Sequence, residues 1–427
     1  MNYRVFSRNL WSKWSNYTRI SLTWIATVTL VFSSCQSQSQ TISQTPSPAP
    51  STPSPVASST EIIESTPARS EPSAPSTGKA GIVIATPSQT PDLVANLIEN
   101  ATPVGLPTDV AATATMRATR KPESTPTLSA DDPAFYGTSI DELTARTYGD
   151  GEFKFTETIT RNETYHQFTF EYESDNQIVE GFMTLPAGTG EFGEKFPVLF
   201  LLHGYVPPDE YELFPYSARY VLPFVEAGYM VIHPSYRGHP PQPNSSWDNV
   251  FRIEYAIDVL NLIAMVREGS ENPAGPFRRA DKDKLFLWGH SMGGGIAQRT
   301  LTVRPDWISA AALYASMSGD EARNYERIRK WGDERTWRVE YFAPQEVIER
   351  VSPIYFIDRW EAPITIHHGD IDEIVPPEWS RELCEQLKAK RHPVECHEYY
   401  NYRHNLYGSA EAVFTARVIS FFEKYQQ

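Results

Sequence analysis

The sequence predicts an α/β domain built on a mostly parallel, doubly wound sheet, which follows a long segment that cannot form a core. Two observations support this fold class. Short, continuous apolar runs alternate with helical segments after residue 131, as expected for strands covered by helices on both faces. In addition, a serine framed by glycines directly follows one of these runs. Strands that alternate with helices indicate a parallel sheet.

Composition divides the chain into unequal parts. The 34 prolines concentrate in the first third with Ser, Thr and Gln, whereas residues able to form a core lie mostly after Asp131. The formal net charge of -15 argues against nucleic acid as a partner, because phosphate contacts need clustered Lys and Arg. No spacing of the three cysteines and ten histidines is typical of a zinc site, so we expect neither a metal nor a cofactor.

Residues 1–35 have the three parts of a secretory signal peptide. A basic start precedes the apolar run Ile20–Phe32, which is too short to span a bilayer comfortably. The segment Phe32-Ser33-Ser34-Cys35 resembles the lipobox of bacterial lipoproteins, with Phe32 in place of the usual Leu. We therefore expect lipidation at Cys35 and a lipid anchor to a membrane of the bacterial cell envelope. An uncleaved signal anchor or ordinary cleavage are alternatives, and both also place the remaining chain outside the cytoplasm.

Residues 36–130 form a low-complexity tether rich in Ser, Thr, Pro and Gln. Such a segment buries too little apolar surface to offset its chain entropy, so we expect it to be disordered. A coil of this length spans on the order of 50–60 Å, which would give the following domain reach from the membrane.

Residues 131–427 contain the predicted domain. It begins with three alternating β-prone runs that indicate an antiparallel meander: Phe153–Thr160, Tyr165–Tyr172 and Gln177–Leu185. The apolar runs that follow are Pro197–His203, Tyr229–His233, Leu285–Trp288, Ala310–Tyr314 and Ile364–His367, with a further strand at Val394–Tyr399. The helical segments are Ser217–Ala227, Val250–Arg267, Gly294–Val303 and Glu378–Ala389.

Ser291 is the predicted nucleophile. The strand Leu285–Trp288 leads into Gly289-His290-Ser291-Met292-Gly293 and then a helix, which is the nucleophile elbow of the α/β-hydrolase fold. The tight turn strains the serine backbone and leaves room only for small residues two positions away on each side.

Asp372 and His404 are the predicted acid and base. A serine hydroxyl needs a base that takes its proton and a third group that orients the base. In this fold the acid and then the histidine follow the serine along the chain. Asp372 lies in the loop after Ile364–His367, where Asp370 is the competing carboxylate and is better suited to shaping the loop. His404 follows the next strand, whereas His367 and His368 precede the acid and are interpreted as strand-end residues.

Two backbone N–H groups are expected to bind the oxyanion of the tetrahedral intermediate. One belongs to Met292, directly after the nucleophile, and the other to Tyr205, in the loop after Pro197–His203.

From about Gln177 to Phe422 the chain resembles the catalytic domain of the prolyl oligopeptidase family, which includes dipeptidyl and acylaminoacyl peptidases. The shared segments are Leu-Leu-His-Gly-Tyr at 201–205, Gly-His-Ser-Met-Gly-Gly at 289–294, His-Gly-Asp-Ile-Asp-Glu-Ile-Val-Pro at 368–376, and the late His404. The resemblance implies a serine peptidase. The chain departs from the family in two features, because it has no room for an N-terminal β-propeller and no Glu-Glu pair to hold a free substrate N-terminus.

An insertion at about 316–360, rich in charged and aromatic residues, resembles a small helical lid. Tyr236 and Arg237 follow a strand end and could border the pocket or merely anchor their loop. Cys384 and Cys396 could form a disulfide in an oxidising compartment. Because a helix and the strand after it can also bury two unpaired thiols, we predict that these cysteines are unpaired.

The leading hypothesis is therefore an exported serine peptidase that acts on peptides through an acyl-enzyme. A carboxylesterase acting on small esters with the same residues is the alternative, and a non-catalytic envelope module is a third hypothesis, because fold does not fix function.

Overall fold

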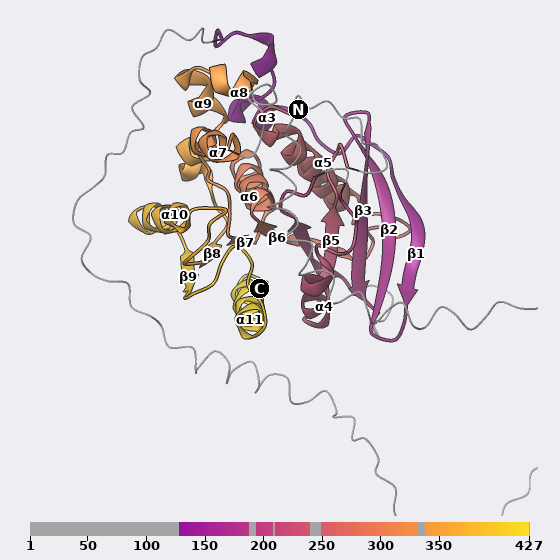
Figure 1. The fold of residues 1–427 in the computed structure, drawn as a ribbon. Coiled ribbons are helices and arrows are strands. Elements are labelled where there is room, and N and C mark those ends of the chain that lie inside the picture. The colour runs from indigo at the N-terminus through magenta and orange to yellow at the C-terminus, as the bar shows by residue number, and fades with distance from the viewer. Residues whose placement is uncertain (1–127, 188–193, 208–209, 240–248, 331–337, 427) are drawn as a thin grey trace, which may run out of the picture. The chain divides into compact units, whose positions relative to one another are not determined.

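The computed structural model describes residues 128–187, 194–207, 210–239, 249–330 and 338–426 (Figure 1). The signal peptide, Cys35 and nearly all of the tether lie outside the described residues. Within the described part of the chain, no helix is both long enough and apolar enough to cross a membrane.

A nine-stranded sheet organises the domain in the order β1-β2-β3-β5-β4-β6-β7-β8-β9. The strands are β1 (Phe153–Arg161), β2 (Tyr165–Ser174), β3 (Gln177–Pro186), β4 (Phe196–Leu202), β5 (Met230–Pro234), β6 (Ala280–His290), β7 (Ala310–Tyr314), β8 (Ile364–Gly369) and β9 (Val394–Tyr399). Strands β1 to β3 pair antiparallel, and β3 pairs antiparallel with β5. From β5 to β9 every pairing is parallel, which confirms the predicted fold class.

Helices cover both faces of the parallel part (Figure 1). They are α3 (Ile140–Ala145), α4 (Ala218–Glu226), α5 (Ile253–Gly269), α6 (Met292–Val303), α7 (Glu321–Ile328), α8 (Arg338–Phe342), α9 (Gln345–Val351), α10 (Pro377–Ala389) and α11 (Ser409–Glu423). Apolar residues of α5, α6 and α10 form one core with the sheet, and those of α4 and α11 form a second core on its other face. This two-sided burial explains why the inner strands are continuously apolar.

The insertion after β7 is helical, as predicted, and comprises α7, α8 and α9. Residues of α9 share a third apolar cluster with α3 and α5, so this part of the insertion is an outer layer packed on α5 and α6. The aromatic residues Trp331 and Trp337 lie outside the described residues.

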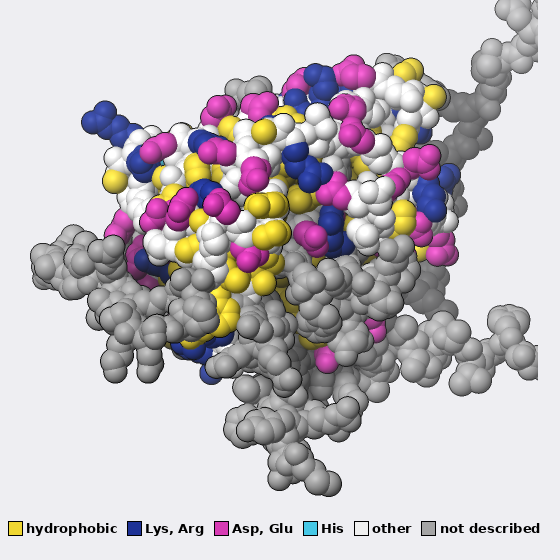
Figure 2. All heavy atoms as spheres, turned by 90° about the horizontal axis from the view of Figure 1, so that it is seen from above, with side chains coloured by type: hydrophobic (Ala, Val, Ile, Leu, Met, Phe, Trp, Pro, Cys, Tyr) yellow, Lys and Arg dark blue, Asp and Glu magenta, His cyan; other side chains and the backbone are white. Residues whose placement is uncertain are grey.

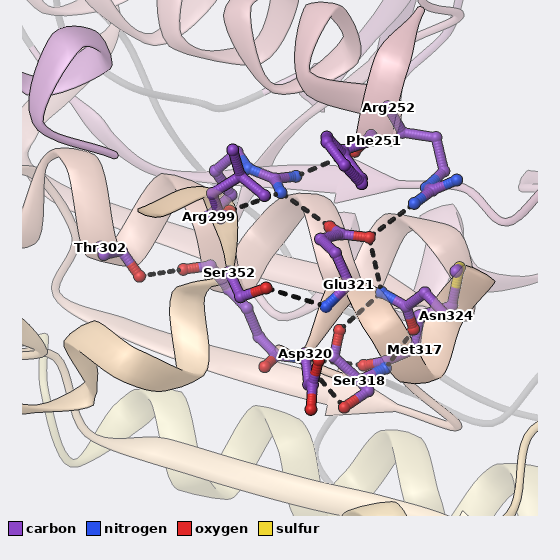
Figure 3. Close-up of polar contacts among 12 residues, drawn as sticks. Phe251, Arg252, Arg299, Thr302, Met317, Ser318, Asp320, Glu321, Asn324 and Ser352 are labelled. Atoms are coloured by element: carbon purple, nitrogen blue, oxygen red, sulfur yellow. Dashed lines mark hydrogen bonds and ion pairs between the residues drawn. The ribbon is translucent and has the colours of Figure 1, made fainter. Parts of the chain in front are cut away.

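A buried ion network joins α7 to the body of the domain (Figure 3). The carboxylate of Glu321 accepts hydrogen bonds from Arg252 at 2.5 Å and from Arg299 on α6 at 2.7 Å. Arg252 also contacts Glu340 of α8 at 3.4 Å. Because buried charges are costly unless paired, these contacts fix α7 against α6.

Cys384 on α10 and Cys396 on β9 form a disulfide, with their Cα atoms 6.4 Å apart. The prediction of two unpaired thiols is therefore wrong. Adjacent elements can bury thiols or bond them, and the relative placement of α10 and β9 that decides between the two is not readable from spacing alone.

The face seen from above in Figure 2 carries both signs of charge. In its described part, Lys and Arg side chains are interspersed with Asp and Glu side chains, with apolar side chains between them.

Candidate active site

The nucleophile elbow lies between β6 and α6. Ser291 has φ 54° and ψ -116°, a left-handed backbone that side chains rarely adopt. A Cβ added to Gly289 would lie 2.4 Å from the Gly293 carbonyl oxygen, so only glycine fits at position 289. The elbow therefore has the strained geometry that the motif predicts.

Hydrogen bonds fix the backbone of Ser291 on both sides. Its N–H donates to the Tyr314 carbonyl at 3.0 Å, and its carbonyl accepts from the Met317 N–H at 3.0 Å. Its carbonyl also accepts from the first turn of α6. The residue as a whole is half-buried, so it stays accessible at the surface of the site.

Asp372 follows β8 and has both carboxylate oxygens occupied. Oδ1 accepts from the backbone N–H groups of Ile374 at 2.7 Å and Val375 at 3.0 Å. Oδ2 accepts from His404 at 2.7 Å and from His368 at 2.9 Å. Burial alone would raise the pKa of Asp372, but the hydrogen bonds from the two imidazoles outweigh it and lower the pKa well below the usual range. Asp372 is therefore an ionised carboxylate at neutral pH.

His404 follows β9 and is buried. Its Nδ1 faces Oδ2 of Asp372 at 2.7 Å, and an ionised carboxylate can only accept. We therefore assign the proton to Nδ1, which leaves Nε2 unprotonated and available as a base. This is the orientation that a serine nucleophile requires of its histidine.

The acid loop and the base loop are tied to each other. Asp370 accepts from the backbone N–H of Asn401, and Glu373 pairs with Arg403. A further bond runs from the Ile371 N–H to the Tyr402 carbonyl at 3.1 Å. Asp370 thus bonds a backbone group of the base loop, as expected of a residue that shapes the loop.

His368 holds the acid in place, a role that the sequence reading missed. Its Nε2 faces Asp372 at 2.9 Å and the Val375 carbonyl at 3.1 Å, while the Ser380 hydroxyl contacts Nδ1 at 2.6 Å. The position of His368 four residues before the acid is the only sequence signal of this contact. Ser380 lies on α10, the helix that the Cys384–Cys396 disulfide joins to β9.

The end of β4 packs against the elbow. A Cβ added to Gly293 would lie 2.1 Å from the Leu202 carbonyl oxygen, and one added to Gly204 would lie 3.1 Å from Cβ of Ser291. The two segments that carry the predicted oxyanion donors, Tyr205 and Met292, therefore meet at Ser291. Met292 begins α6, where N–H groups have no partner within the helix. The use of these two N–H groups as an oxyanion hole stays a prediction.

Four large side chains are exposed on the loops that carry these residues: Tyr205 at 53%, Ile371 at 45%, Tyr400 at 81% and Tyr407 at 60%. We call them the rim. Arg237, by contrast, is buried and bonds Asp258 of α5 at 2.6 Å, so it anchors its loop and does not border the pocket.

The arrangement is suited to nucleophilic acyl transfer, because the oriented base His404 packs against His290, the residue that precedes the strained serine. The described residues hold no group of three or more His, Cys, Asp or Glu side chains placed to bind a metal ion.

Comparison with known proteins agrees with this chemistry. Residues 216–427 match the prolyl oligopeptidase family. The uncharacterized peptidase YtmA of Bacillus subtilis (strain 168) is 24% identical over 251 residues, which cover 56% of this chain and 85% of that protein. The acylaminoacyl peptidase of Pyrococcus horikoshii has a similar structure, with a TM-score of 0.51 and 20% identity over 61% of this chain.

The chain spans less than half of the solved peptidase chains. It covers 42% of the Pyrococcus horikoshii enzyme and 36% of a Bacteroides ovatus chain of dipeptidyl aminopeptidase type, which it matches with a TM-score of 0.52 and 15% identity. At these identities the structural likeness establishes the α/β-hydrolase fold.

Proposed function

We propose that the chain, whose residues 216–427 match the prolyl oligopeptidase family, is a serine peptidase that works through Ser291, Asp372 and His404. His404 Nε2 takes the proton of the Ser291 hydroxyl as its oxygen attacks the substrate carbonyl. The same nitrogen then protonates the leaving amine, and an acyl-enzyme remains. Water attacks the acyl-enzyme, gives its proton to Nε2 and releases the acid, and the proton returns to Ser291.

One observation carries the proposal. His404 donates to the carboxylate of Asp372 and packs against His290, whose neighbour Ser291 is held in a left-handed backbone conformation. This arrangement assigns one role to each residue of the triad. A base oriented in this way can activate a serine nucleophile, which neither a purely structural module nor a binding module needs.

We further propose that the protein is exported and anchored through a lipidated Cys35. The N-terminal signal supports this, and so does the Cys384–Cys396 disulfide, because such bonds persist in oxidising compartments. Labelling of growing cells with a radioactive or alkyne-tagged fatty acid would test it. Wild-type protein should carry the label and Cys35→Ala should not, whereas equal labelling of both would refute the anchor.

The catalytic proposal is tested with the full-length protein purified in detergent. A fluorophosphonate probe should label the wild type but not Ser291→Ala, and His404→Ala should label at a rate lower by several orders of magnitude. Labelling that persists in Ser291→Ala would overturn the assignment of the nucleophile.

The substrate class is then decided by two leaving groups. We expect hydrolysis of peptidyl p-nitroanilides, and kcat/KM should depend on the residue before the scissile bond. Hydrolysis of p-nitrophenyl acetate with no anilide turnover would replace the peptidase by a carboxylesterase that uses the same three residues.

A further inference from the structure

We propose that Tyr216 and His290 form a positioning pair that holds the backbone of His404 and the turn at Gly204 in register around Ser291. The inference rests on the proposed serine hydrolase function. It assigns roles to two residues outside the triad, one of which is the variable position of the nucleophile motif.

Hydrogen bonds run through the pair from one side of the site to the other. The Gly204 N–H donates to the Tyr216 hydroxyl at 2.9 Å, and that hydroxyl bonds Nδ1 of His290. On its other side, Nε2 of His290 lies 3.1 Å from the carbonyl oxygen of His404. The contacts join three distant parts of the chain, because 74 residues separate Tyr216 from His290 and 114 separate His290 from His404.

The direction of each bond follows from its acceptor. A carbonyl can only accept, so Nε2 of His290 carries a proton and donates it to His404. In a neutral imidazole the other nitrogen, Nδ1, is then an acceptor, and the Tyr216 hydroxyl must donate to it. A lone pair of the same hydroxyl accepts from the Gly204 N–H, so the hydroxyl donates one hydrogen bond and accepts one, and each imidazole nitrogen of His290 makes one.

His290 is held in this neutral form by its surroundings. It is buried, and its ring stacks on Tyr314 with centroids 4.4 Å apart and lies 4.8 Å from the ring of His404. Burial, followed by the neighbouring His404, lowers the pKa of His290 well below its ordinary value. The donor and acceptor ends of the imidazole therefore stay fixed as His404 gains and loses its proton.

The pair acts by position, not by chemistry. A Cβ added to Gly204 would lie 2.5 Å from the Tyr216 hydroxyl and 3.1 Å from Cβ of Ser291. The Tyr216 hydroxyl and the Ser291 side chain therefore both pack against Gly204. The Tyr216 hydroxyl donates its proton to His290, and the hydrogen bond from His290 to His404 goes to the backbone carbonyl and not to the imidazole. The imidazole of His404 is thus held from two directions, by Asp372 at Nδ1 and by His290 at the main chain.

The experiment compares Tyr216→Phe, His290→Gln and the double variant in full-length protein, with a peptidyl anilide and with the fluorophosphonate probe. We expect Tyr216→Phe to lower kcat and the labelling rate by about tenfold and to leave KM within about twofold, because misplacing a base by a fraction of an ångström affects the chemical step more than ground-state binding. The double variant should be no slower than His290→Gln alone, because both substitutions break one chain of bonds.

Tyr211→Phe is the matched control. Tyr211 is a buried tyrosine whose hydroxyl lies 3.4 Å from Nε2 of His233, and His233 does not contact the triad. This variant should keep the wild-type kcat even if its thermal unfolding temperature falls.

The outcomes separate the two proposals. If the wild type labels at Ser291 and Tyr216→Phe keeps its full kcat, or if the two substitutions have additive effects, the positioning pair is refuted while the hydrolase stands. If a fall in kcat comes with equal losses in Tyr211→Phe, the pair is likewise refuted, because any lost hydroxyl in this region has the same effect. If the wild type neither labels nor turns over substrate, the proposed function fails and the pair fails with it.

Discussion

Two neighbouring glycines of α6 should respond in opposite ways to the same added methyl group. A Cβ on Gly293 would lie 2.1 Å from the Leu202 carbonyl oxygen and 2.7 Å from that of His203, and both of these are backbone atoms. A Cβ on Gly295 would meet only Cβ of Met317, at 3.4 Å, which is an ordinary van der Waals contact. Gly293→Ala and Gly295→Ala are therefore a matched pair.

The magnitude follows from these distances. To restore ordinary contact, the end of β4 must move away from the elbow by about 1 Å, and a misplacement of this size costs about 100-fold in rate. Overpacking at such a position also lowers the free energy of unfolding by about 1–3 kcal/mol. At Gly295 the alanine fits and favours the helix, so the free energy of unfolding should rise by up to about 1 kcal/mol.

The assay is kcat/KM for an activated substrate, measured beside urea unfolding of each variant. We expect Gly293→Ala to lose about 100-fold in kcat/KM while most molecules stay folded, and Gly295→Ala to stay within about threefold of the wild type. A folded Gly293→Ala enzyme with nearly wild-type kcat/KM would show that the contact between β4 and the elbow does not set the geometry of the site.

Three further variants test other contacts. Asp372→Asn should lower kcat by about 10⁴-fold, because an amide cannot hold His404 in the required tautomer. Since the native pKa of Asp372 is lowered, its contribution to stability is present above about pH 4 and lost as the pH falls toward the folded pKa, so the stability gap between this variant and the wild type should narrow in urea unfolding at pH 3. Glu321→Gln should cost about 3 kcal/mol of unfolding free energy by leaving buried arginines underpaired, and a loss below 1 kcal/mol would contradict the role of the network. Replacing Cys384 and Cys396 by serine should lower the unfolding free energy by about 2–3 kcal/mol, and adding reductant should bring the wild type to the same value, whereas insensitivity of the wild type to reductant would argue against the bond.

The sequence was most informative where structure is decided locally. The nucleophile elbow requires a strand, a tight turn with small residues and a helix within about ten positions, and all of these are readable from residues 285–303. The order of acid and base along the chain then singled out Asp372 and His404, whose contact the structure contains. The strand bounds were less accurate: β6 begins at Ala280 and not at Leu285, because the four residues before Leu285 are all charged and have no apolar pattern.

Contacts between distant segments were not predictable in the same way. Nothing near Tyr216 in the sequence indicates that its hydroxyl reaches His290, and His368 was interpreted as a strand-end residue although it bonds the acid. The short helix α3 is a different case, because Ser139 and Glu142 form a capping box whose pattern was readable but not used. The contacts of Tyr216 and His368 depend on how distant segments pack, which the sequence does not indicate. Helix α3, by contrast, has a local capping pattern from which it could have been predicted.

The contacts around the triad also bear on where substrate preference arises. The three residues of the proposed triad bond other protein groups: Asp372 through both carboxylate oxygens, His404 through Nδ1 and its carbonyl, and Ser291 through its main chain. Polar groups that already bond protein are not available to bind a substrate side chain, so these three residues distinguish poorly between one acyl group and another. The rim residues have the opposite character, because they are large, exposed and carried by the same loops. Preference among substrates should therefore follow the rim: Tyr400→Ala should raise KM for a long peptide substrate by several-fold and leave kcat for a small ester unchanged, and equal effects on both substrates would assign Tyr400 to the framework of the base loop.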